Sequence, residues 1–143
     1  MEGFFIGEFA HAVDGKGRLA IPVKFRPRFA EGVIVTRWLE HSLAVFPTSR
    51  FAELQERVAK LPLADRNARE FSRFLFAGAH EDAPDAQGRI TLPRHLRDYA
   101  GVGRDTVVIG ANDHLEIWAP EAWRDYIAES EGSMAERLED LGI

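Results

Sequence analysis

Two short stretches of this sequence carry the same chemically functional residues at the same spacing. The first reads Asp-Gly-Lys-Gly-Arg-Leu-Ala-Ile-Pro over residues 14–22, and the second reads Asp-Ala-Gln-Gly-Arg-Ile-Thr-Leu-Pro over residues 85–93. Each shared residue recurs 71 positions later, which indicates a duplicated module rather than chance composition. The sequence therefore predicts two related half-units in one chain.

The order of residue types within each copy predicts a hairpin turn that leads into a strand. An aspartate at the first turn position accepts hydrogen bonds from backbone N–H groups that follow it, and a glycine three residues later supplies a positive φ. The apolar residues after the turn alternate with small ones, which is typical of a strand with one buried face. Pro22 and Pro93 should end these strands, because proline has no N–H to donate to the ladder.

The arginine after each turn is the residue that turn geometry does not require. The simpler interpretation pairs Arg18 with Asp14 and Arg89 with Asp85 as surface ion pairs. The alternative is contact with nucleic acid, because a guanidinium presents a rigid fork of donors that fits phosphate oxygens or guanine O6 and N7. The residues alone leave both interpretations open.

The chain is acidic overall, but its charge is unevenly distributed. The formal net charge is −5, yet residues 1–71 carry eleven Lys and Arg against nine Asp and Glu, while residues 72–143 carry seven against fourteen. A phosphate contact depends on the local field rather than on net charge. The first turn and the segment after it form a local basic patch, because residues 16–28 hold five basic residues and no acidic one: Lys16, Arg18, Lys24, Arg26 and Arg28.

Hydrophobic periodicity and turn residues outline the remaining elements. Strands are expected over residues 4–13, 33–36, 43–46, 106–109 and 115–118. Helices are expected over residues 49–61, 65–77 and 93–100 and from Pro120 onward. Asp65 is the expected N-cap of the second helix, Trp123 and Ile127 are expected on the core face of the last, and Ser133 and Glu136 spell a capping box for a small terminal helix.

Enzymatic and metal-binding functions find little support in the residues. The chain has no cysteine, no Gly-x-Ser-x-Gly elbow, no P-loop and no dinucleotide fingerprint. The densest group of potential metal ligands, His80, Glu81 and Asp82 with Asp85, lacks the i, i+4 spacing of a helical zinc site. A metal-dependent hydrolase is thus the weakest alternative, and we expect no catalysis, no metal, no cofactor and no small-molecule substrate.

No stretch approaches the ~20 apolar residues of a membrane span, so we expect a cytoplasmic protein without a membrane partner.

The motifs resemble those of a known family of bacterial transcriptional regulators, the MraZ family. The resemblance rests on both Asp-x-x-Gly-Arg copies, on Phe-Ile-Gly-Glu-Phe at residues 5–9 with His11, and on Glu-Arg-Leu-Glu-Asp-Leu-Gly at residues 136–142. It covers nearly the whole chain. The resemblance implies an α+β, β-rich fold in which two SpoVT/AbrB-like half-units form a duplicated β-barrel of the swapped-hairpin or double-psi type, with flanking amphipathic helices. The half-units would span residues 8–54 and 79–126, with a helical connection over 55–78 and a helical tail over 127–143.

The same resemblance implies a function. Members of this family would form a ring-shaped homo-oligomer on the nucleoid and bind direct repeats in double-stranded DNA upstream of their own operon, which holds division and cell-wall genes. The family's DNA-contact motif, Asp-x-x-x-Arg, maps onto Asp14 and Arg18 in the first copy and onto Asp85 and Arg89 in the second. From the local basic patch and the repeat we add Lys16 as a DNA-binding residue, with Lys24, Arg26 and Arg97 as supporting phosphate contacts. The alternative is an antitoxin-like oligomer whose turn arginines bind acidic partner surfaces.

The second copy departs from the first in its charge. Gln87 stands where the first copy has Lys16, and Asp98 follows Arg97. We therefore expect the first copy to carry more of the salt-dependent attraction to DNA.

Overall fold

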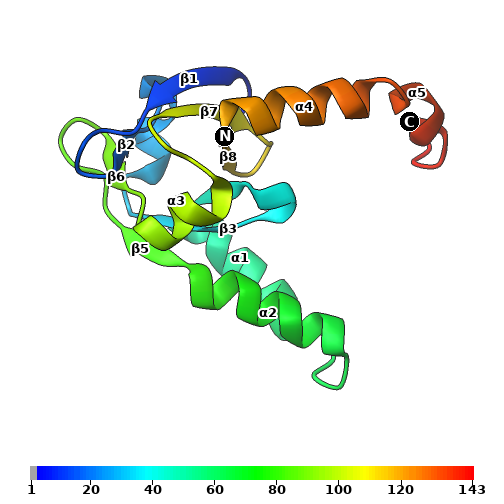
Figure 1. Cartoon of the computed structure of the whole chain (residues 1–143). Helices are drawn as coiled ribbons and strands as arrows, with labels where there is room; N and C mark the ends of the chain where they lie inside the picture. The colour runs from blue at the N-terminus through cyan, green and yellow to red at the C-terminus, as the bar shows by residue number, and fades with distance from the viewer. Residues whose placement is uncertain (1–2) are drawn as a thin grey trace.

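The computed structural model describes residues 3–143, and its strands and helices fall into two half-units (Figure 1). The first comprises β1 (Glu8–Ala12), β2 (Arg18–Ala20), the 3₁₀ segment η1 (Val23–Phe29), β3 (Val33–Arg37), η2 (Leu39–His41), β4 (Leu43–Pro47) and α1 (Thr48–Ala59). Helix α2 (Arg66–Gly78) leads to the second, which comprises β5 (His80–Asp82), β6 (Arg89–Thr91), α3 (Arg94–Ala100), β7 (Asp105–Gly110), β8 (Leu115–Trp118) and α4 (Pro120–Glu131). The short helix α5 (Met134–Glu139) ends the chain. The expected strands and helices are thus present, and Asp65 caps α2 by accepting a hydrogen bond from Asn67 N.

The two half-units exchange strands to build one antiparallel sheet. Its strand order is β1-β7-β8-β4-β3-β5, while β2 and β6 pair with each other in a separate ribbon. The strands of the two half-units correspond in chain order: β1 to β5, β2 to β6, β3 to β7 and β4 to β8. If each strand of the sheet is replaced by its counterpart, the result is the same strand order read from the opposite edge. The pairing therefore has two-fold symmetry, and each half-unit contributes strands on both sides of the axis.

The strand pairing of residues 3–143 does not close into the expected β-barrel. The six-stranded sheet ends at β1 and β5, and an isolated bridge between Val13 and Leu19 joins β1 to the ribbon. Both ribbon strands are only three residues long. Pro22 and Pro93 follow each strand closely and stop its ladder, because neither has an N–H to donate. The fold is α+β with a mostly antiparallel sheet and flanking helices.

The main hydrophobic core lies between the ribbon and the large sheet, and both half-units fill it. Leu19 and Ile90 of the ribbon are buried there with Phe25 from η1 and Leu96 from α3. A half-unit of about 50 residues is too small to hide enough apolar surface by itself. The shared core solves this, since each half-unit completes the core of the other.

A second cluster explains why counterpart helices in the two half-units are buried to different extents. Phe51 of α1 is buried with Phe46 and with Leu75 of α2, which packs beside it. In the second half-unit α4 has no buried residue. The clusters of buried residues found within residues 3–143 include no residue of α4. Figure 1 shows α4 running away from the sheet with α5 at its far end.

The expectations for the two C-terminal helices were therefore partly wrong. Trp123 and Ile127 are only half-buried and do not lie in the core. Trp123 stacks edge-on against Trp118 at 5.1 Å, and its indole N–H donates to Glu8 Oε1 at 2.8 Å. Ser133 makes no side-chain capping bond at the start of α5, so the capping box is not formed.

The described helices are also short. None of those within residues 3–143 has the length and apolar composition needed to cross a bilayer.

Candidate nucleic-acid interface

The ribbon of β2 and β6 positions the two predicted motifs side by side. Leu19 pairs with Ile90 in the antiparallel register, and both side chains point into the core, where they are 2% and 1% exposed. Because side chains alternate along a strand, the flanking residues point outward. Arg18 lies opposite Thr91 and Arg89 opposite Ala20 on this outer face. Figure 1 shows the two turns, one blue and one green, extending together from one end of the molecule.

The first turn forms as its aspartate and glycine predict. Asp14 Oδ1 accepts hydrogen bonds from the backbone N–H groups of Lys16 and Arg18, each at 2.9 Å. Gly17 adopts a φ of 76°, in the left-handed region that a side chain disfavours. Asp14 Oδ2 then accepts a bond from Arg18 Nε at 3.0 Å. Asp14 therefore has two roles, since one carboxylate oxygen shapes the turn and the other orients the Arg18 side chain.

The second turn repeats this geometry. Asp85 Oδ1 accepts from the backbone N–H groups of Gln87 and Arg89 at 2.9 Å, and Asp85 Oδ2 accepts from Arg89 Nε at 2.7 Å. In each turn the N–H of the arginine is the largest influence that lowers the pKa of the aspartate. Both carboxylates are thus held ionised at neutral pH, and each neutralises part of its arginine's charge.

The two turns meet in one charged cluster. Arg18 Nη1 lies 4.0 Å from Asp85 Oδ2 across the ribbon, in addition to its own partner Asp14. The side chains of Arg18 and Arg89 are 28% and 31% exposed, so both are partly accessible to solvent. The ion pairs of the simpler interpretation are present.

Arg26 and Arg97 each link one half-unit to the turn of the other and so brace the two turns, a role that was not predicted from the sequence. Each Nε donates to a carbonyl of its own half-unit, at Ile21 and at Leu92, with both distances 2.9 Å. Each guanidinium then lies over the turn of the other half-unit. A Cβ on Gly88 would collide with Arg26, and one on Gly17 would lie 3.3 Å from Arg97. Arg26 and Arg97 are 71 residues apart, as are the matching residues of the two motifs, and this spacing could have indicated their common role.

The remaining predicted contacts divide between the turn and η1. Lys16 is exposed at the tip of the first turn. Lys24 instead lies on η1, with Nζ 5.3 Å from the centre of the Phe9 ring and 5.0 Å from that of Phe25. The structure thus brings the Asp14, Arg18, Asp85 and Arg89 side chains together, and places Lys24 apart from the turn tips.

The His80–Asp82 segment has a structural role. Asp82 Oδ2 accepts from the N–H of Thr91 at 2.7 Å, and Oδ1 accepts from that of Ala83 at 2.9 Å. Within residues 3–143, no three His, Asp or Glu side chains are arranged to hold a metal ion. The Asp82 carboxylate therefore holds the backbone of β6 in place through its hydrogen bond to Thr91.

A buried histidine, His114, was not predicted from the sequence. His114 is 8% exposed and lies between two carboxylates, with Nδ1 2.7 Å from Asp113 Oδ1 and Nε2 3.0 Å from Glu116 Oε2. Its ring stacks on Phe46 at 4.9 Å. Burial alone lowers the pKa of His114, but the hydrogen bonds to Glu116 and Asp113 outweigh it and raise the pKa.

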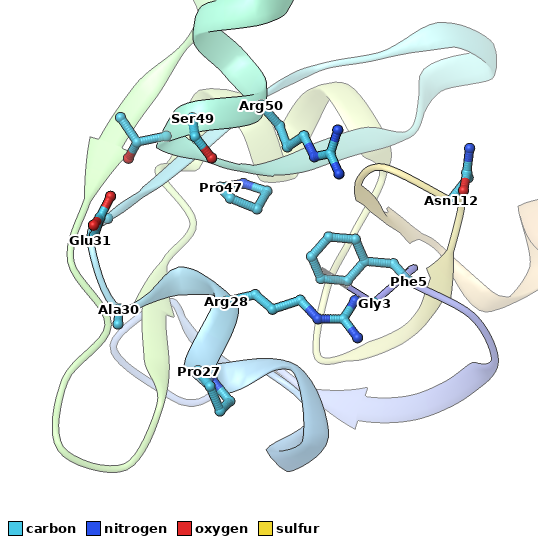
Figure 2. A pocket seen from close by; sticks show the side chains of 12 residues that line it. Gly3, Phe5, Pro27, Arg28, Ala30, Glu31, Pro47, Ser49, Arg50 and Asn112 are labelled. Carbon is cyan, nitrogen blue, oxygen red and sulfur yellow. The ribbon is translucent and has the colours of Figure 1, made fainter. Parts of the chain in front are cut away.

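A separate pocket of about 390 Å³ opens between η1 and the start of α1 (Figure 2). Figure 2 shows the Arg28 and Arg50 side chains extending from these two elements beside Phe5. The Arg28 guanidinium lies 4.7 Å from the centre of the Phe5 ring, and its Nη1 is buried without a hydrogen-bond partner in residues 3–143. The pocket wall includes none of the turn residues.

Comparison with known proteins identifies the family. The chain matches the family described as "MraZ protein, putative antitoxin-like" twice, over residues 4–74 and 75–141. It is 46% identical to the transcriptional regulator MraZ of Salinispora tropica over 132 residues, which cover 92% of this chain and 93% of the relative. It is 44% identical to the Leuconostoc citreum protein of that name, with 96% and 93% covered, and 42% identical to that of Natranaerobius thermophilus, with 97% and 99% covered.

These relatives define a class of transcriptional regulators, which is not a class of enzymes. The chain belongs to the MraZ family, as the duplicated motif indicates. The boundary between the two family matches falls within α2, at residues 74 and 75, which agrees with a duplication joined by this helix.

Proposed function

We propose that this chain is a sequence-specific DNA-binding regulator that reads double-stranded DNA through its paired Asp-x-x-x-Arg turns. The observation that carries the proposal is the convergence of Arg18 and Arg89 on one outward face, where turns from both half-units meet. Hairpin geometry accounts for the aspartates and glycines but not for an arginine in each copy. A donor fork held at a fixed angle suits base edges and phosphates.

The wider proposal follows the family. The chain binds direct repeats upstream of its own operon, in the cluster of division and cell-wall genes, as a ring-shaped homo-oligomer on the nucleoid. Its half-units are of SpoVT/AbrB-like type, with residues 8–54 and 79–126 as the half-units, 55–78 as the connection and 127–143 as the tail. The interleaving of strands from the two half-units in one sheet supports a duplicated fold.

The subunit contact is proposed on α4 and α5. Neither helix buries a residue within the single chain. Trp123 is half-exposed, and Leu141 of the tail is 69% exposed. A helix as short as α5 gains stability from packing rather than from its own propensity, so a neighbouring subunit is the partner that these apolar side chains require.

Gel shifts across a salt series test the DNA-binding proposal. The probes are the chain's own upstream region and a scrambled duplex of equal length. We expect tighter binding to the upstream region, and a fall in affinity with salt whose log–log slope is about 0.9 per phosphate neutralised. Equal affinity for both duplexes at every salt concentration would contradict sequence-specific binding.

A second candidate is an antitoxin-like module whose turn arginines bind an acidic protein surface. The family description, which includes the words "putative antitoxin-like", favours testing it. Co-purification of a stoichiometric protein partner, lost in Arg18→Ala, without measurable affinity for the upstream DNA would favour this candidate over the first.

A further inference from the structure

The backbone of the ribbon has the same two-fold symmetry as the sheet. Ile21 N donates to Gly88 O, and Leu92 N donates to Gly17 O, both at 2.8 Å. The turn bonds of Asp14 are repeated at Asp85. The backbone, the two aspartates and the two arginines therefore present the same contacts after a half-rotation. By themselves they do not distinguish the two directions of a DNA helix.

The turn tips break this symmetry chemically. Lys16 and Gln87 occupy equivalent positions, since the N–H of each donates to the aspartate of its own turn at 2.9 Å. Both side chains are exposed. A lysine ammonium donates only and acts as a point charge, whereas a glutamine amide donates and accepts and fits the N6 and N7 atoms of adenine. The two tips thus suit different ligand atoms.

The outer ribbon face is also asymmetric. Thr91 lies directly opposite Arg18, while its counterpart Ala20 lies opposite Arg89. Residues directly opposite on antiparallel strands have Cβ atoms about 5 Å apart, close enough to interact. Arg18 therefore has a neighbour with a hydroxyl group, and Arg89 has a methyl group in the same place.

The two side chains that hydrogen-bond to the backbone at the ends of β2 and β6 differ in charge as well. Asp82 Oδ2 accepts from the N–H of Thr91 at 2.7 Å. Its counterpart His11, 71 positions earlier, hydrogen-bonds with the backbone of Ala20, and burial lowers the pKa of His11. The second copy is thus hydrogen-bonded by an anionic carboxylate, whereas the first copy is hydrogen-bonded by a neutral imidazole. This adds to the stronger positive charge of the first turn.

We propose that Lys16, Gln87 and Thr91 make this symmetric ribbon directional, so that they determine which way round each chain lies on its DNA repeat. The inference rests on the proposed DNA-binding function. Direct repeats all point the same way along the DNA, so equivalent subunits must each recognise a direction. A two-fold symmetric reader would bind a repeat and its inverse equally well. The side chains that differ between the copies supply the discrimination.

The test is to make the two copies alike. The symmetrised variant is Gln87→Lys with Thr91→Ala, which gives the second copy the residues of the first at these positions. Asp82 bonds to the backbone N–H of Thr91, so the substitution at this position retains that bond. A control, Glu56→Gln, changes the net charge by the same amount at an exposed position of α1, away from the ribbon. Circular dichroism and urea unfolding check that all proteins are folded.

The readout is selection from a random duplex library, followed by affinity measurement. We expect the wild type and Glu56→Gln to enrich an asymmetric sequence, and the symmetrised variant to enrich a two-fold symmetric one. On two copies of the selected repeat, the wild type should prefer the direct over the inverted arrangement by about tenfold, the discrimination that one base-edge contact supplies. The symmetrised variant should bind both arrangements within about twofold.

The outcomes separate this inference from the proposed function. If the wild type binds selected DNA but its sequence is palindromic, or if the symmetrised variant keeps the wild-type preference, the directional role is wrong and DNA binding stands. If the wild type enriches no sequence over the starting library, the proposed function fails and the inference fails with it.

Discussion

Arg26 of the first half-unit lies across Gly88 of the second, and the glycine leaves the space that its guanidinium occupies. Gly88 also adopts a φ of 73°, which a side chain disfavours. Arg97 and Gly17 repeat the relationship from the other side. Two turns that are far apart in sequence are thereby held in one fixed arrangement.

Gly88→Ala should destabilise the protein by about 1–3 kcal/mol, because the new Cβ is strained at positive φ and displaces the Arg26 brace. Gly15→Ala is the matched control, since a Cβ there has no neighbour within 4 Å. Urea unfolding gives both free energies. Equal stability of the two variants would show that the brace is unimportant.

Arg18→Ala should weaken binding to the upstream DNA by about 1–3 kcal/mol, the value of one bidentate base contact. The side chain is partly exposed, so the free energy of unfolding should change by no more than about 0.5 kcal/mol. Anisotropy titration and urea unfolding measure the two quantities. Arg66→Ala on the exposed face of α2 is the control and should leave DNA affinity unchanged. Wild-type affinity in Arg18→Ala would remove this residue from the interface.

Asp14→Asn should weaken DNA binding less than Asp14→Ala. Asparagine keeps an oxygen that accepts the N–H bonds from Lys16 and Arg18, whereas alanine loses them and releases the turn. Both variants lose the charge that pairs with Arg18 Nε. Affinities from the same titration distinguish the two roles, and an equal loss would indicate that the charge matters more than the turn geometry.

Stability should fall as the pH rises through the folded pKa of His114. Its carboxylate partners raise this pKa above the ordinary value of 6.5, so the protonated form stabilises the folded state. That contribution is complete below the unfolded pKa of about 6.5 and is lost as the pH rises through the higher folded pKa. Urea unfolding between pH 5.5 and 8.5 should show this decline in the wild type and a flatter profile in His114→Gln. His11, whose pKa burial lowers, has the opposite effect but is present in both proteins. Parallel profiles would contradict the role of His114.

Removal of residues 133–143 should reduce the size of the oligomer measured by light scattering, because Leu141 and its neighbours are then lost from the proposed contact. Affinity for an operator with several repeats should fall by about 10²–10⁴, since linked subunits gain avidity without new contacts. Affinity for a single repeat should be unchanged. Full-length protein that is monomeric at micromolar concentration, with equal affinity for one and for several repeats, would contradict the ring mechanism.

The turns were predictable from the sequence because their determinants are local. Asp14 reaches N–H groups two and four residues on, and Gly17 supplies its own φ, so four or five consecutive residues suffice. The same holds for Asp65 at the start of α2 and for the prolines that end the ribbon strands. Duplication then indicated that a second turn of the same kind exists.

Tertiary structure decided how these local pieces combine. The pairing of β1 with β7, and the placement of Arg26 over Gly88, join residues far apart in the chain, and side-chain periodicity does not specify the partner of a strand. The position of Trp123 shows the same limit. Its helix has the pattern of α1, yet the buried face of α1 shares a cluster with α2, β3 and β4, whereas α4 has no buried residue. Local hydrogen bonds and backbone angles depend on residues that are neighbours in the sequence. A shared core depends instead on which strands and helices pack against one another, and these are far apart in the chain.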